Sequence, residues 1–244
     1  MKEVIYRTIA RVLPRMEKGY GLPFGHLETA LLGLRSRGFD PRWAFDIGAN
    51  RGKWSSDFKR VFPGCRMTLV EPQREMARYL NEFCAEWKDC EWIESAVSNQ
   101  VGTKVFTVCP DTYSSGFWQT EHYAKAHQFE RREVKTITLD SIVANADGSI
   151  PDVVKIDAER HEREILRGAN ALLGKTELFF IEANLFGEEE VDDFASLIKA
   201  MDEHGYLPYD FTWFYQRPKD GALMLVEIAF VLKSSPLRAF KGWS

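Results

Sequence analysis

The chain has 244 residues, of which 45% are hydrophobic and 13% aromatic, and its formal net charge is −4 with a pI near 5.8. This length and composition allow one large buried core. The acidic balance argues against a nucleic-acid partner, and the lack of an 18-residue apolar run argues against a transmembrane segment.

The N-terminus shows charged residues and no apolar signal core, so we expect a cytoplasmic protein. The cysteines agree with this, because their spacing contains no C-x-x-C pair and is typical of reduced thiols; they are Cys65, Cys84, Cys90 and Cys109.

Residues 1–40 are predicted to form a helical extension, followed by one domain over residues 41–244. Apolar residues recur at helical spacing from Ile5 to Met16, where Pro14 should end or kink the helix. The basic residues of this segment fit either contact with an anionic surface or a solvated face, and we favour the solvated face.

Beyond residue 40, strand and helix patterns alternate along the chain. Strands are predicted near 43–47, 66–71, 91–97, 152–157 and 177–183, and helices near 26–35, 53–61, 73–86, 161–173 and 188–204. Alternation of this kind predicts an α/β fold whose mostly parallel sheet is covered on both faces. Two final strand patterns, 206–212 and 224–232, are joined by turn residues and predict a hairpin with an antiparallel edge strand.

A glycine-rich turn follows the first strand of this domain. Asp46 ends the strand, Gly48 and Gly52 allow sharp backbone turns, and Glu71 ends the next strand. Acids at neighbouring strand ends build nucleoside pockets in doubly wound sheets, where Glu71 would accept hydrogen bonds from ribose hydroxyls. The turn alone fits an ordinary strand–turn–helix connection equally well.

Three ligand classes compete for this turn. The dinucleotide pattern G-x-G-x-x-G fails at Asn50 and Lys53, which stand where glycines are needed. The phosphate-loop pattern fails because Trp54 follows Gly52-Lys53 and the spacing is one residue short. S-adenosylmethionine has a ribose and no phosphates, so it fits the pattern best.

Three stretches resemble the FkbM methyltransferases. They are FDIGAN at 45–50 with Glu71-Pro72, the segment VVKIDAERHE at 153–162, and LRGA at 166–169. The resemblance implies a class I, Rossmann-like methyltransferase with a mostly parallel seven-stranded sheet. It also implies S-adenosylmethionine as cofactor and transfer usually to oxygen, often on sugars or natural products. Arg160 departs from the family pattern, which has glycine there.

The resemblance also suggests roles for the cofactor-binding residues. Asp46 and Asn50 would reach the amino-acid end of the cofactor, Glu71 the ribose, and the strand end at Ser95-Ala96 the adenine. The full predicted set is Asp46, Gly48, Asn50, Gly52, Glu71, Pro72, Ser95, Ala96 and Asp157.

Asp157, Glu159 and His161 are the candidate catalytic residues. Asp157 ends a strand, so it should lie in the crevice at the strand ends. Methyl transfer to a hydroxyl needs in-line positioning and a proton acceptor, and His161 has a suitable unperturbed pKa. These residues could instead cap the following helix.

A metal-dependent variant uses Asp157, Glu182 and Asn184. Three oxygen ligands at adjacent strand ends could hold Mg²⁺. We favour the simpler alternative, in which Glu182 hydrogen-bonds backbone or cofactor without a metal.

Residues 99–140 interrupt the helix–strand rhythm and form the expected substrate-side insert, rich in aromatic and hydroxyl side chains. The predicted activity is O-methylation of a small hydroxylated acceptor, a saccharide or secondary metabolite. An NAD-linked oxidoreductase and a cofactor-binding scaffold without turnover are the alternatives. The oligomeric state, a homodimer included, is left open.

Overall fold

The computed structural model describes residues 25–146, 148–186 and 194–239. The helix predicted within residues 5–16 and the start of the one predicted at 188–204 lie outside the described residues. Among the helices that are described, none is long and apolar enough to cross a membrane.

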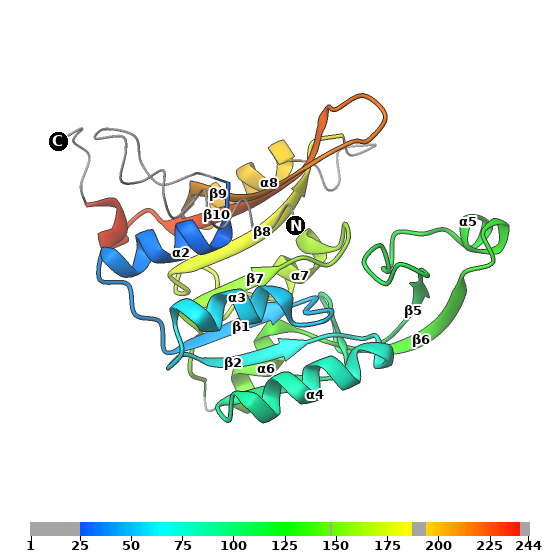
Figure 1. Ribbon diagram of the computed structural model, residues 1–244, viewed down its shortest axis with the longest axis horizontal. Coiled ribbons are helices and arrows are strands. Elements are labelled where there is room, and N and C mark those ends of the chain that lie inside the picture. Colours follow the sequence, from blue (N-terminus) through cyan, green and yellow to red (C-terminus); the bar gives the residue numbers. More distant parts are fainter. Residues whose placement is uncertain (1–24, 147, 187–193, 240–244) are drawn as a thin grey trace, which may run out of the picture.

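A seven-stranded sheet forms the centre of the molecule, in the order β3-β2-β1-β7-β8-β10-β9 (Figure 1). Its strands are β1 (Trp43–Ile47), β2 (Arg66–Val70), β3 (Cys90–Ile93), β7 (Val153–Ile156), β8 (Leu178–Asn184), β9 (Tyr206–Gln216) and β10 (Leu223–Leu232). Pairings among the first five in this sheet are parallel, whereas β10 runs antiparallel to both its neighbours. This confirms the class I Rossmann-like fold expected from the sequence.

The hairpin differs from the prediction in one respect. The antiparallel strand β10 lies inside the sheet, between β8 and the edge strand β9. The burial pattern agrees with this position, because residues 226–231 of β10 are all buried while residues 213–216 of β9 are exposed. A strand with so many buried residues is stabilised by a neighbour on each side.

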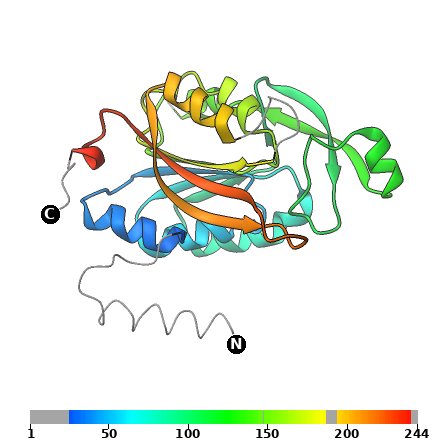
Figure 2. The same ribbon diagram turned by 90° about the horizontal axis from the view of Figure 1, so that it is seen from above.

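Helices cover both faces of this sheet (Figure 2). One core packs α2 (Leu27–Ser36), α3 (Lys53–Val61) and α4 (Ala77–Glu86) against one face. A second core packs α6 (Leu139–Asn145), α7 (Glu162–Arg167) and α8 (Phe194–Glu203) against the other. All residues of β1 and β7 are buried, as expected for central parallel strands.

Two predicted elements are shorter than expected. The strand predicted at 91–97 is divided into β3 and β4 (Ala96–Val97), which belong to different sheets. The helix predicted at 161–173 ends at Arg167, where Gly168 follows as C-cap. A Cβ on Gly168 would lie 2.5 Å from the Ser98 carbonyl oxygen, so the chain crosses a neighbouring backbone there. A short 3₁₀ turn, Arg74–Met76, precedes α4.

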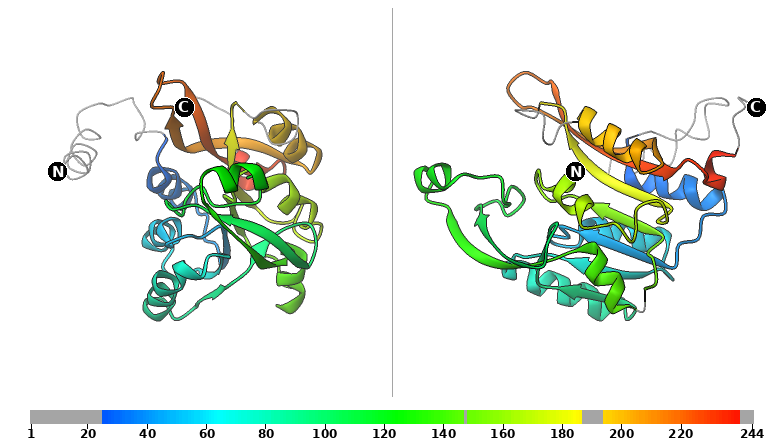
Figure 3. Two further views of the ribbon diagram at one scale, coloured as in Figure 1. Left: turned by 90° about the vertical axis from the view of Figure 1, so that its right-hand side faces the viewer. Right: turned by 180° about the vertical axis from the view of Figure 1, so that it is seen from behind.

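The insert at 99–140 supplies two strands of a second, three-stranded sheet in the order β4-β6-β5, and β4 lies just before the insert. The strands β5 (Gly102–Val108) and β6 (Glu130–Ile137) flank the short helix α5 (Glu121–Ala126). Figure 3 shows this hairpin extending away from the seven-stranded sheet.

Gly48 is required by a backbone crossing. It has a φ of 72°, and a Cβ there would lie 1.8 Å from the carbonyl oxygen of Asp157. We expect Gly48→Ala to lower the free energy of unfolding by about 3 kcal/mol, because overpacking adds to the left-handed strain. Gly38→Ala is the control: Gly38 has a φ of 86° and no atoms within 4 Å of a Cβ. Urea denaturation showing equal losses for the two variants would contradict the crossing.

Candidate active site

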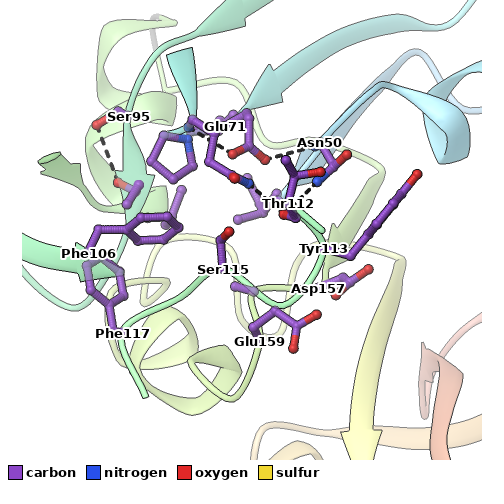
Figure 4. Close-up of a pocket in the computed structure, with 18 residues that line it drawn as sticks. Asn50, Glu71, Ser95, Phe106, Thr112, Tyr113, Ser115, Phe117, Asp157 and Glu159 are labelled. Atoms are coloured by element: carbon purple, nitrogen blue, oxygen red, sulfur yellow. Dashed lines mark hydrogen bonds between the residues drawn. The ribbon is translucent and has the colours of Figure 1, made fainter. Parts of the chain in front are cut away.

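A pocket opens at the carboxyl ends of β1, β2 and β7 (Figure 4). It encloses about 600 Å³, including space open to solvent. It is lined by Ile47, Gly48, Asn50, Val70, Glu71, Pro72, Gln73, Ser95, Ala96, Val97, Phe106, Thr112, Tyr113, Ser115, Phe117, Asp157, Ala158 and Glu159. Most of the predicted cofactor-binding residues are therefore brought together in one place.

Glu71 is fixed in this pocket by backbone hydrogen bonds. One carboxylate oxygen accepts from the Asn50 backbone N–H at 2.8 Å, and the other accepts from the Gln73 N–H at 2.9 Å. Burial raises its pKa, although these two hydrogen bonds favour the charged form. The carboxylate is thus held with lone pairs left for a ligand's hydroxyl groups.

Asp46 lies beneath the pocket and is not among the lining residues. It is fully buried, and its carboxylate accepts from Ser55 Oγ at 2.6 Å and pairs with Lys155 Nζ at 3.1 Å. Lys155 also donates to the carbonyl of Gly48 at 3.0 Å and lies 3.4 Å from Asp157. Burial opposes the charge of Lys155, but Asp157 and Asp46 outweigh it and raise its pKa. Asp46 therefore supports the turn through Lys155, which bonds to the Gly48 carbonyl.

Gly52 also lies outside the pocket lining. Its φ is 70° and it is the N-cap of α3. A Cβ there would face Leu80 and Phe83 in the core at ordinary contact distances. Gly52 therefore ends the turn and begins the helix. Asn50, with a φ of 46°, lines the pocket itself.

The far wall of the pocket is largely apolar and aromatic. Phe106 and Phe117 meet edge to face with ring centroids 5.3 Å apart. Ser95 and Ala96 lie beside them at the point where the chain passes from one sheet to the other, and Ser95 Oγ donates to the Lys135 carbonyl at 3.0 Å. An apolar, flat-sided wall of this kind suits a planar ring.

A sharp loop after β7 carries Asp157 and Glu159. Glu159 and Arg160 have φ values of 51° and 66°, so two consecutive non-glycine residues adopt the left-handed conformation. The family glycine at position 160 is thus replaced without loss of the backbone shape that glycine favours. The Arg160 guanidinium lies 4.8 Å from the centre of the Trp118 ring, a cation–π contact.

Carboxylates crowd together at this loop. Asp157, Glu159 and Glu182 each place an oxygen within 4.8 Å of the others. Burial, and then the charges of Asp157 and Glu162, raise the pKa of Glu159 to about 8. Burial and the charge of Asp157 likewise raise the pKa of Glu182 well above its usual value.

These three carboxylates could hold a hard divalent cation, which prefers oxygen ligands. The set differs from the predicted one, because Glu159 takes the place of Asn184. The Asn184 side-chain oxygen instead accepts a hydrogen bond from the nearby backbone N–H of Phe186 at 2.8 Å.

His161 lies behind the pocket wall. It is 8% exposed, its Nε2 is 3.0 Å from Ser98 Oγ, and its ring lies 4.7 Å from that of Phe117. Burial and the nearby charge of Lys104 lower its pKa to about 4. A buried residue outside the pocket lining is poorly placed to accept a proton from an acceptor, so the geometry does not favour His161 as base.

Sequence reasoning missed two of the polar lining residues. Gln73 follows Glu71-Pro72 directly, and its position two residues beyond the ribose acid was an available signal. Thr112 belongs to the insert, and its approach to the turn at 48–52 depends on a tertiary contact that no local pattern shows.

The sheet order, the strand-end acid and the carboxylate loop together define a class I methyltransferase. The family model of the FkbM methyltransferase domain matches residues 46–208. The chain therefore belongs to the FkbM methyltransferase family. A search of curated proteins gives no match.

Solved structures resemble the chain in fold. An FkbM methyltransferase from Methylobacillus flagellatus is 15% identical with a TM-score of 0.48, and the match covers 78% of this chain but only 43% of that one. Aeropyrum pernix fibrillarin with bound S-adenosyl-L-methionine is 14% identical with a TM-score of 0.45, covering 83% of this chain and 74% of that one. A Burkholderia thailandensis N1-methyltransferase with bound S-adenosylhomocysteine is 14% identical with a TM-score of 0.40, covering 94% and 86%.

The position of His161 predicts a pH-dependent stability. With a folded pKa of about 4 and an unfolded value of about 6.5, its stability contribution is complete above pH 6.5 and is lost as the pH falls toward 4. Between pH 7 and pH 4, we expect the free energy of unfolding of the parent to fall by about 2–3 kcal/mol more than that of His161→Gln. Urea denaturation at the two pH values measures this. The exposed His127 supplies the control, His127→Gln, which should behave as the parent. Identical losses in parent and His161→Gln would contradict the buried neutral imidazole.

Proposed function

We propose that this protein transfers the methyl group of S-adenosylmethionine to a hydroxyl oxygen of a small acceptor, a saccharide or secondary metabolite. The buried carboxylate of Glu71 carries the cofactor half of the proposal. It is held by two backbone N–H groups in a pocket without a phosphate-binding pattern. The bound cofactor would supply an activated methyl group on a sulfonium centre.

The residues present fit this cofactor. Glu71 would accept from the ribose hydroxyls, and the wall of Ser95, Ala96 and Phe106 would receive the adenine. Gly48 and Asn50 lie at the opposite side of Glu71, where the amino-acid end would lie. The unpartnered buried oxygen of Asn50 supports a polar ligand there.

The acceptor half rests on the ends of the next strands. Glu182 and Glu227 are register partners on β8 and β10, and Glu227 is in turn paired with Trp213 of β9. Paired residues share a face of the sheet, so these carboxylates continue the cluster begun by Asp157. Carboxylates accept hydrogen bonds from hydroxyls, and Trp213 stacks with Tyr215 at 5.9 Å to give an exposed aromatic surface. Both features support a polyhydroxylated or ring-shaped acceptor.

Glu159 is better placed than His161 to accept the hydroxyl proton. It lines the pocket, and its pKa of about 8 brings it close to the operating pH expected of a general base. Asp157 would then hold the acceptor and maintain the charge of Lys155. Because the methyl donor is already activated, positioning supplies much of the rate.

The ribose assignment is tested with Glu71→Gln. We expect the affinity for S-adenosylhomocysteine to fall by about 1–3 kcal/mol, because the amide offers one oxygen where the carboxylate offers two. Isothermal titration calorimetry measures this, with NAD as a ligand control and Glu82→Gln as a charge-matched surface control. Unchanged affinity in Glu71→Gln would remove the ribose assignment.

The base assignment is tested with Glu159→Gln. Screening saccharides and phenolic metabolites for S-adenosylhomocysteine release, with Mg²⁺ and with EDTA, would first identify an acceptor. The parent's kcat should then rise with pH through about 8, and Glu159→Gln should lower kcat by about 10²-fold or more and remove this rise. His161→Gln should keep the same pH profile. A parent-like profile in Glu159→Gln would exclude Glu159 as base.

A further inference from the structure

The loop from Cys109 to Gln119 passes over the cofactor pocket, where one of its carbonyl groups accepts two side-chain hydrogen bonds. Farther along the loop, Gly116 pairs with Thr107 of β5. The Thr112 carbonyl oxygen accepts from Gln73 Nε2 at 2.9 Å and from Asn50 Nδ2 at 3.1 Å (Figure 4). Gln73 and Asn50 are the two residues whose backbone N–H groups hold Glu71. The loop is therefore attached directly to the residues around the ribose acid.

The attachment leaves several polar atoms without partners. Six buried side-chain polar atoms lack a hydrogen bond within the described parts of the chain, and four of them belong to this loop or to the residues that hold it. They are Asn50 Oδ1, Gln73 Oε1, Thr112 Oγ1 and Gln119 Oε1. Gln73 is only 3% exposed, and its side chain contacts the loop through the Thr112 carbonyl.

A buried polar atom without a partner is unfavourable, because it has given up its hydrogen bonds to water and gained none in return. Lifting the loop would expose these oxygens to water. A ligand with hydroxyl and amino groups beneath the loop would give donors to those of Asn50, Gln73 and Thr112, which line the pocket. Thr112, with a φ of 62°, adds left-handed strain to the closed position. Closure of the loop without a ligand therefore leaves these buried oxygens without hydrogen-bond donors, whereas closure over a polar ligand is favourable.

Two further contacts join the loop to both halves of the active site. The Arg51 guanidinium lies 5.7 Å from the ring centre of Tyr113 in the loop and 5.2 Å from that of Tyr79 on α4. On the acceptor side, a Cβ on Gly116 would lie 3.2 Å from Glu159 Cβ. The loop thus packs against the proposed base while it covers the proposed cofactor site.

We propose that residues 109–119 form a lid that closes on the bound cofactor, and that Gln73 is the positioning residue that latches it through the Thr112 carbonyl. This inference rests on the proposed function, since the ligand that satisfies the lid is the nucleoside part of S-adenosylmethionine. Closure also completes the wall beside Glu159, so the acceptor site is assembled once the cofactor is in place.

The test uses the full chain and S-adenosylhomocysteine as the probe. Gln73→Glu keeps the side-chain shape but turns the donor that faces the Thr112 carbonyl into an oxygen, and Gln73→Met removes the donor. In stopped-flow fluorescence we expect the dissociation rate of S-adenosylhomocysteine to rise at least tenfold in Gln73→Glu and by less in Gln73→Met. Tyr113→Ala should also raise it, and Tyr113→Phe, which keeps the ring over Arg51, should restore the parent rate.

Hydrogen exchange separates a lid from a general loss of structure. In the parent, S-adenosylhomocysteine should slow amide exchange in residues 109–119, and Gln73→Glu should lose this protection while β1 and β7 stay protected. Gln100→Glu adds the same charge at an exposed position and should match the parent.

If Gln73→Glu released S-adenosylhomocysteine at the parent rate and kept the amide protection of residues 109–119, the lid would be overturned and the cofactor assignment would stand. Failure of the parent itself to bind S-adenosylhomocysteine would overturn the proposed function, and the cofactor lid with it.

Discussion

The buried charge of Lys155 is the interaction on which the rest of the site depends. Its ammonium group joins Asp46 on β1, the Gly48 carbonyl in the following turn and Asp157 at the end of β7. A buried cation is stable only when paired and hydrogen-bonded. These partners therefore fix the relative positions of the two strand ends and of the turn between cofactor and acceptor sides.

Much of the fold follows from local pattern. Mostly apolar runs at 43–47 and 153–156, each with a single charged residue, identify the central strands, and the glycine turn identifies the first crossover. The interior place of β10 was not predictable from its turn chemistry, because a hairpin sequence does not say which of its strands meets the sheet. The split between β3 and β4 was likewise hidden, since both halves lie in one continuous strand-like stretch.

The site was predictable where a residue's role follows from its place on a strand. Glu71 and Asp157 lie at strand ends and line the pocket. Asp46 also ends a strand, yet its side chain faces the core of the sheet and meets Lys155. Sequence spacing does not distinguish these two outcomes. The role of His161 as base stays a prediction, because a buried imidazole packed on Phe117 and one that faces an acceptor look alike in sequence.

The position of β10 has a consequence for how the chain reaches its final form. The strand that separates β8 from β9 is β10 (Leu223–Leu232), which follows both of them along the chain. Until β10 emerges from the ribosome, one edge of β8 is unpaired. All but one of the seven residues of β8 are buried in the folded protein. Such edges are templates for association with other chains. Synthesis therefore leaves the half of the site built on β8 exposed until β10 has been made, whereas β1, β2 and β7 can pair before it.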